Sequence, residues 1–255
     1  MKTIYYNDFS DNFVETKNQE KKVPDNYQFI KTNPLAKFLG AILFCFFKFI
    51  GHIYATFVLG LKVEGKYKLK NHIKSTRSGY YIYANHVLTY GDVYNPALYS
   101  PIHPYYICDS SNLGIPILGP ILPFVGALPI PDSIKGKKRL FDAISTRAKQ
   151  GNAIVIYPEA HVWPYYTNIR PFDTTAFAFP ARDNLPIFTA TTTFMPRKFR
   201  KKPRAVIYID GPFSAPEDLS RHEKSACLRD KALSSMQKHA KRSTVKYINY
   251  KKRES

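Results

Sequence analysis

Residues 79–92 read GYYIYANHVLTYGD, a stretch in which an apolar, tyrosine-rich run leads into a histidine and an aspartate. The first seven residues favour a β-strand, because aromatic and β-branched side chains fit a pleated surface. His86 follows this strand directly, and Asp92 comes six positions later, after Gly91. A continuous helix would hold the two side chains roughly 120° apart. We therefore expect a turn between them, which Gly91 makes easy, with Asp92 at the start of the next helix.

Such a pair can do chemistry if the two side chains meet. An aspartate that accepts a hydrogen bond from one imidazole nitrogen fixes the tautomer and leaves the other nitrogen as a base. A histidine satisfied in this way is also common as a purely structural residue. The pair alone therefore leaves both roles open for His86 and Asp92.

The sequence around this stretch alternates short apolar runs with helical patterns. Strands are expected at 79–85, 104–109, 126–130, 152–158, 186–194 and 204–212, and amphipathic helices at 133–150 and 216–242. This alternation predicts an α/β fold with a mixed central sheet flanked by helices.

The most apolar part of the chain, residues 35–61, follows Pro34 and predicts a membrane-associated helix. At about 40 Å it would be long enough to cross a bilayer. Lys37, Lys48 and His52 interrupt it and fall on one narrow stripe of the helix. A spanning helix would hold Lys48 near the bilayer centre, where a charge costs about 2.5–3.5 kcal/mol of insertion free energy. A helix lying in the interface avoids this cost, and we favour it over a spanning helix and over a core helix of a soluble domain.

Four segments follow from these patterns. They are a polar N-terminal segment at 1–34, the apolar helix at 35–61, an α/β domain at 62–242 and a basic C-terminal tail at 243–255.

The net charge of +19 predicts an anionic partner, which can be nucleic acid, an acidic lipid surface or a phosphorylated substrate. More than half of this charge lies in residues 196–255, where 17 lysines and arginines face six acidic residues. The three cysteines are far apart, without metal-ligand spacing. This spacing indicates a reducing compartment and no metal site.

Four blocks in order resemble the motifs of the glycerolipid acyltransferases, of the 1-acylglycerol-3-phosphate or lysophospholipid acyltransferase type. They are YANHVLTYGD (83–92), PFVGALPIPDS (123–133), IVIYPEAHVWPYYTNIRPFDTTAF (154–177) and LPIFTATTTF (185–194). Together they cover residues 80 to about 195, and the apolar helix also agrees with a family whose members attach to membranes.

The resemblance implies transfer of a fatty acyl chain from acyl-CoA or an acyl-carrier protein to a hydroxyl of a lysophospholipid or related glycerolipid. His86 would act as general base, oriented by Asp92, and no cofactor or metal would be needed. Glu159 matches the glutamate of the third block, which belongs to the acceptor-binding region. The enzyme would work at an anionic membrane surface, on the cytoplasmic face, and nucleic acid would not be a partner.

The sequence departs from the family's pattern at three places. Five residues, rather than four, separate the motif histidine from the aspartate. Asp132 and Val162 stand where the family has arginines, the first of which usually holds the acceptor phosphate. Arg170 and the basic cluster at 135–139 are candidate substitutes for phosphate binding. His161 is a candidate acceptor contact or second acid/base, or else a loop residue with local hydrogen bonds.

Two other functions fit the same sequence. The altered spacing and the missing arginines also fit a lipid-binding relative without activity. The basic charge and the aromatic residues also fit a nucleic-acid-binding protein, although no nucleic-acid-binding signature is present.

Overall fold

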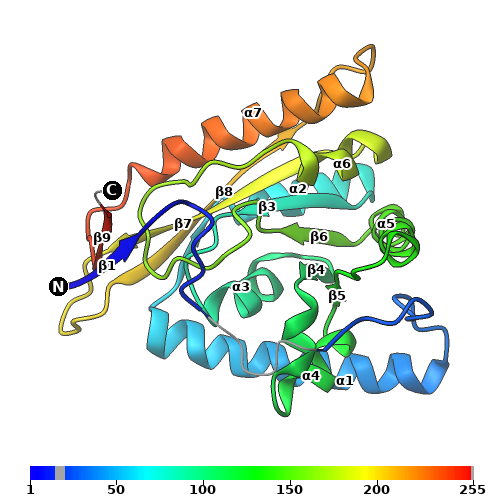
Figure 1. Ribbon diagram of the computed structural model, residues 1–255, viewed down its shortest axis with the longest axis horizontal. Helices are drawn as coiled ribbons and strands as arrows, with labels where there is room; N and C mark the ends of the chain where they lie inside the picture. Colours follow the sequence, from blue (N-terminus) through cyan, green and yellow to red (C-terminus); the bar gives the residue numbers. More distant parts are fainter. Residues whose placement is uncertain (15–20, 254–255) are drawn as a thin grey trace.

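The computed structural model describes residues 1–14 and 21–253 (Figure 1). The strands are β1 Lys2–Tyr6, β2 Lys62–Glu64, β3 Tyr80–Ala84, β4 Pro104–Cys108, β5 Ala127–Pro129, β6 Ala153–Ile156, β7 Ile187–Met195, β8 Arg204–Phe213 and β9 Ile248–Lys252. The α-helices are α1 Pro34–Ile53, α2 Lys66–Thr76, α3 Gly91–Tyr99, α4 Leu118–Ile121, α5 Ile134–Lys149, α6 Ala178–Asp183 and α7 Arg221–Ala240. A π-helical segment, Tyr54–Leu59, continues α1.

The central sheet has the strand order β2-β8-β7-β3-β6-β4-β5. Its pairs are parallel except β7 with β8, which is antiparallel, so the sheet is mixed. β3, the strand of the opening stretch, lies between β6 and β7 and is buried along its whole length. The expected α/β fold and each of the six expected strands are therefore confirmed, with ends shifted by a few residues.

Helices cover both faces of this sheet. Successive side chains of β3 point to opposite faces, so they pack against two different groups of helices. Tyr80 and Ile82 pack in one apolar cluster with Leu69 of α2 and Tyr99 of α3. Tyr81 and Tyr83 pack in the other cluster, with side chains of α5, α6 and α7. A strand buried on both faces has no polar side to mark its orientation, which explains the continuous apolar run in the sequence.

α1 lies outside α3 and packs against it along one side (Figure 1). Asn33 caps the helix by accepting from the backbone N–H of Leu35 at 2.9 Å, and Pro34 occupies the first turn. The buried side of the helix consists of Gly40, Phe47 and Gly51. The ring of Phe47 packs on the ring of Tyr94 in α3, with 4.5 Å between the two centroids.

The opposite side of α1 is an exposed surface of large apolar side chains, which we call the apolar face. Its residues are Leu35, Phe38, Leu39, Ile42, Phe46, Phe49, Ile50, Ile53, Phe57 and Val58. Helical geometry places Lys37, Lys48 and His52 along one border between the buried side and the apolar face. The segment Pro34–Leu59 is long and apolar enough to cross a bilayer by length and composition, but here its buried side is docked on the domain.

The two ends of the chain pair with each other, which the sequence did not indicate. β1 and β9 form a parallel two-stranded sheet in which Lys2 lies opposite Ile248 and Tyr6 opposite Lys252. Residues 243–255 were expected as a basic tail, yet part of this segment is a strand. The strand was missed because its partner, β1, lies more than 240 residues away in the sequence.

The packing of α1 on α3 predicts that a Gly→Ala substitution in this helix destabilises the protein, the opposite of the usual effect. In an exposed helix, Gly→Ala stabilises by about 1 kcal/mol through helix propensity. At Gly51 an added Cβ would lie 2.9 Å from the Cβ of Tyr94, so we expect Gly51→Ala to lower the free energy of unfolding, by about 1–3 kcal/mol. Chemical denaturation in detergent would measure this change.

Cys45→Ala is the matched control, because Cys45 is exposed on the same helix. It should change stability by less than about 0.5 kcal/mol. If Gly51→Ala stabilised the protein, α1 would not lie against Tyr94 as described here.

Candidate active site

The candidate site is built at the carboxyl ends of two neighbouring parallel strands. β3 and β6 pair in a register that sets Tyr83 opposite Ile156. His86 and Glu159 each come three residues further along, so the register places them next to each other. The backbone N–H of His86 donates to Glu159 Oε2 at 3.0 Å. Carboxyl ends of parallel strands are where α/β proteins commonly form their sites.

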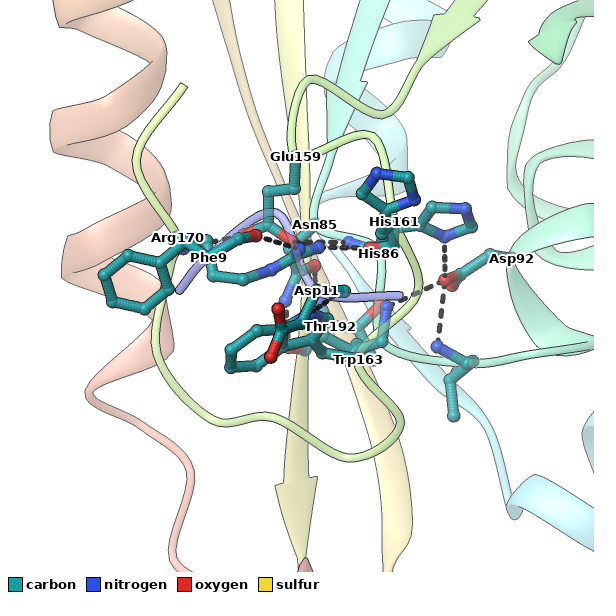
Figure 2. A network of polar contacts seen from close by, with 12 residues as sticks. Phe9, Asp11, Asn85, His86, Asp92, Glu159, His161, Trp163, Arg170 and Thr192 are labelled. Atoms are coloured by element: carbon teal, nitrogen blue, oxygen red, sulfur yellow. Dashed lines mark hydrogen bonds and ion pairs between the residues drawn. The ribbon is translucent and has the colours of Figure 1, made fainter. Parts of the chain in front are cut away.

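His86 and Asp92 are in hydrogen-bond contact, with Nδ1 of the histidine 2.8 Å from Oδ2 of the aspartate (Figure 2). The same oxygen accepts the backbone N–H groups of Val87 and Leu88, each at 2.9 Å. Asp92 is 3% exposed and lies in the first turn of α3, where the helix dipole favours a negative charge. The turn thus wraps around the carboxylate, and the extra residue of the motif is absorbed without loss of contact.

The expected role of Gly91 is wrong in its detail. The residue has no left-handed backbone conformation and starts α3 instead of forming the turn. A Cβ there would lie 2.9 Å from Leu88 Cδ1 and 3.0 Å from Leu59 Cδ1. Gly91 is therefore needed for close packing beside the turn.

Tyr157 holds the histidine from a second side. Its ring stacks on the His86 imidazole with 4.3 Å between centroids and an interplanar angle of 22°. Its hydroxyl donates to the backbone carbonyl of Asp92 at 2.5 Å. Burial raises the pKa of this phenol far above its usual value, and the nearby Asp92 carboxylate raises it further, so the group stays a neutral donor.

The remaining nitrogen of the ring, Nε2, has no hydrogen-bond partner in residues 1–14 and 21–253. The His86 side chain is 18% exposed. Asp92 therefore directs one nitrogen inward, and the other remains available to a proton donor from outside. This is the arrangement that a general base requires.

Glu159 and Arg170 form a buried ion pair (Figure 2). Their charged groups are 3.1 Å apart, and their side chains are 0% and 1% exposed. The backbone N–H of Arg170 also donates to Glu159 Oε1 at 2.9 Å, and its guanidinium donates to the carbonyls of His161 and Phe9. Burial lowers the pKa of Arg170, which the Glu159 carboxylate opposes. Both residues were expected to bind the acceptor, but in this structure the Glu159 oxygens and the two terminal guanidinium nitrogens of Arg170 are bonded to protein atoms.

The indole of Trp163 is fully buried in a cluster of aromatic rings. Tyr6, Phe9 and Phe13 from the start of the chain and Tyr250 of β9 surround it. Its Nε1 donates to the carbonyl of Asp11 at 2.8 Å. Trp163 is therefore a core residue, and the paired chain ends are its neighbours.

His161 is partly exposed, and its backbone N–H donates to the carbonyl of Glu159 at 2.8 Å. Figure 2 shows its imidazole on the same loop as the buried pair, and its side chain has no hydrogen bond within residues 1–14 and 21–253. Lys135, Lys137, Lys138 and Arg139 are exposed on α5.

Two hollows, of about 330 and 390 Å³, lie beside residues 27–33, and neither is lined by His86 or Asp92. In the described part of the chain, no group of three or more His, Cys, Asp or Glu side chains could hold a metal ion.

Two residues of the site were not expected from the sequence. Tyr157 lies inside the expected strand 152–158 and directly follows β6 in the structure, and only the stacking geometry reveals its contact with His86. Asn85 joins β3 to β7 by exchanging two hydrogen bonds with the backbone of Thr192, at 2.8 and 3.0 Å. Its place beside His86 was the available signal, since a buried amide must find partners.

No sequence model of a protein family matches the chain, and no curated protein matches it in sequence. The fold is similar to the crystal structure of the 1-acyl-sn-glycerophosphate (LPA) acyltransferase, PlsC, from Thermotoga maritima. The TM-score is 0.60 at 14% sequence identity, over 84% of this chain and 83% of that one. The chain therefore has the fold of a glycerolipid acyltransferase, with its His86–Asp92 pair at the carboxyl edge of the sheet.

The buried pair predicts a large and non-additive stability effect. Glu159→Gln would leave the Arg170 charge buried without a counter-charge, so we expect a loss of about 3–5 kcal/mol in the free energy of unfolding. The double variant Glu159→Gln/Arg170→Met should lose less than the two single variants together. Denaturant titration of the four proteins would measure this coupling.

Glu64→Gln is the control, because Glu64 pairs with Lys62 at 2.8 Å on the exposed surface. It should leave stability nearly unchanged, since exposed pairs contribute little. Additive losses at 159 and 170 would contradict a coupled buried pair.

Proposed function

We propose that the protein is a membrane-bound acyltransferase that moves a fatty acyl chain from an acyl thioester to a hydroxyl of a lysophospholipid or related glycerolipid. The observation that carries this proposal is the 2.8 Å contact between His86 Nδ1 and Asp92, with no hydrogen bond to Nε2 from any residue that the structure describes. The fold shared with an LPA acyltransferase supports the substrate class. The thioester is that of acyl-CoA or of an acyl-carrier protein.

In the proposed reaction, Nε2 of His86 takes the proton of the acceptor hydroxyl while the hydroxyl oxygen attacks the thioester carbonyl. The carbonyl carbon becomes tetrahedral, and its oxygen carries the negative charge. Collapse breaks the carbon–sulfur bond, and the departing thiolate takes the proton from the imidazolium. Asp92 stabilises the imidazolium and keeps the ring in place, and Tyr157 restrains it by stacking.

Glu159 and Arg170 are assigned a positioning role in this proposal. Glu159 accepts from the backbone N–H of His86, and Arg170 holds Glu159 and the loop that follows it. A buried charge pair fixes these segments because its partners cannot separate without large desolvation cost. His161, on the exposed side of this loop, is left as the candidate contact to the acceptor.

The membrane part of the proposal rests on α1. Its buried side is docked on α3 and its apolar face is directed away from the domain. A helix in this position suits insertion into one leaflet parallel to the surface, with Lys37, Lys48 and His52 at the border toward the headgroups. The cytoplasmic face, where acyl-CoA and acyl-carrier protein occur, is the side proposed.

Removal of the base tests the mechanism. His86→Ala should lower the rate of acyl transfer by about 10²–10⁴-fold, because the acceptor hydroxyl loses its proton acceptor. The assay is transfer of a labelled acyl chain from acyl-CoA or acyl-carrier protein to a set of lysophospholipids. An active wild-type protein matched in rate by His86→Ala would disprove the mechanism, and an inactive wild type would favour a lipid-binding relative.

Asp92→Asn tests the orienting role. The amide is uncharged and cannot stabilise an imidazolium as the carboxylate does, so we expect a loss of about a hundredfold or more in kcat. Co-sedimentation with vesicles should be unchanged, because α1 is intact. Loss of both activity and sedimentation would instead assign Asp92 to folding.

A further inference from the structure

The connection between β7 and β8 projects as a basic hairpin tip, residues 196–203. A turn closes it, with the backbone N–H of Arg200 donating to the carbonyl of Arg197 at 3.2 Å. Lys198, Arg200, Lys201 and Lys202 are exposed, and residues 196–203 contain no acidic residue. Phe199 stands among them with 90% of its surface exposed.

Arg197 fixes this tip to the end of the apolar helix. Its guanidinium donates to the backbone carbonyls of Val58 at 2.9 Å and Phe57 at 3.1 Å. These carbonyls belong to the last turn of the π-helical segment that continues α1, where carbonyl groups lack helical partners. Figure 1 shows the tip of the β7–β8 hairpin close to this end of α1.

The tip is therefore held next to the apolar face of α1. Phe57 and Val58, whose carbonyls bind Arg197, themselves belong to that face. The surface consists of a long apolar stripe with a cationic cluster at one end and an exposed aromatic ring inside the cluster. Apolar side chains beside lysines and arginines are the composition of surfaces that bind anionic bilayers.

Phe199 has an unfavourable backbone conformation for its type. Its φ is 61°, in the left-handed region that bulky residues rarely adopt. Burial does not compensate for this strain, because the ring is exposed, with Nζ of Lys198 5.1 Å from its centroid. A strained, exposed aromatic residue at a turn indicates a role outside the folded chain.

We propose that the hairpin tip at 196–203 is a second membrane contact, which inserts Phe199 into the interface of an anionic bilayer and binds lipid phosphates through its lysines and arginines. It deepens the proposed function, because it assumes that the protein works at a membrane. With α1 it gives the domain two contacts with the bilayer, the apolar face along the helix and the cationic tip at its end.

An acidic bilayer explains the surface better than nucleic acid does. A nucleic-acid site needs basic and stacking groups over a hydrophilic surface. Here the basic side chains lie next to the apolar face of α1. A polyanion such as RNA would leave that face exposed to water. The partner with both an apolar phase and negative charge is an anionic lipid surface.

Vesicle binding by the full-length protein tests the charge part. In Lys201→Ala/Lys202→Ala, the partition coefficient onto equal mixtures of phosphatidylcholine and phosphatidylserine should fall by roughly 25-fold, about fivefold per lysine. Binding to phosphatidylcholine alone should change little. The matched control is Lys238→Ala/Lys241→Ala, at exposed positions at the C-terminal end of α7, on the opposite face of the sheet from α1. Equal losses in the two double variants would overturn the proposal.

Phe199→Gly separates insertion from folding. Glycine adopts the left-handed conformation readily, so thermal stability should be kept or raised. Binding to the mixed vesicles should nevertheless fall by about tenfold, because the aromatic ring no longer enters the interface. A stable variant with unchanged vesicle binding would show that Phe199 does not insert.

Phe199→Trp reports insertion directly. The native Trp163 is already fully buried, so it contributes a constant background. Addition of the mixed vesicles should shift the emission of the new indole to shorter wavelength. Polyuridylate RNA should give no such shift, and a response to RNA but not to vesicles would replace the lipid partner by nucleic acid.

Acyl transfer to detergent-dispersed lysophospholipid should be the same in the wild type and in all hairpin variants, because the tip lies outside the His86 site. Weak vesicle binding with full activity in detergent is the result expected. Vesicle binding that is unchanged in the hairpin variants would refute the hairpin proposal. An inactive wild type would refute the acyltransferase proposal, so the two proposals are tested by different measurements.

Discussion

The carboxylate of Glu159 is the constraint on which the arrangement of the site depends. Its side chain is 0% exposed, and a buried charge needs hydrogen-bond partners. Its oxygens accept from the backbone N–H of His86, from the backbone N–H of Arg170 and from the Arg170 guanidinium. One charged group thus ties the end of β3 to the end of β6 and to the loop that follows it. The position of the imidazole is set from behind, by a residue that is itself shielded from the surface.

Both ends of the chain pack against the loop that carries Trp163 and Arg170. Arg170 donates to the carbonyl of Phe9, and Trp163 to that of Asp11, so the N-terminal segment crosses the loop and closes it. β9 pairs with β1 and brings Tyr250 onto the indole with 5.0 Å between ring centroids. A loop of this kind gains rigidity from distant parts of the chain, which suits a site whose function needs a fixed geometry.

The proposed membrane surface and the proposed reacting group are connected through α3. Asp92 lies in the first turn of this helix, and Tyr94, two residues further along, is the residue on which Gly51 and Phe47 of α1 pack. The helix that carries the carboxylate is therefore the same helix that supports the apolar face. In the proposed enzyme this short path would hold the base at a constant depth relative to the lipid surface.

The sequence alone determined six of the seven strands of the central sheet, because strands follow local patterns of a few residues, but it did not indicate β2. The His86–Asp92 pairing was an expectation that depended on a turn between the two residues. The aromatic and β-branched run at 79–85 favours a strand, and Pro34 suits the first turn of a helix, before any tertiary contact is considered. Tertiary structure decided the rest. Glu159 and Arg170 look like free charges in the sequence, and only the β3–β6 register and the crossing N-terminal segment bury them together. The pairing of β1 with β9 and the contact of Arg197 with the end of the apolar helix are equally invisible, since each joins segments more than a hundred residues apart. Local propensity specifies which elements form, whereas partners for buried polar groups are chosen by the packed chain as a whole.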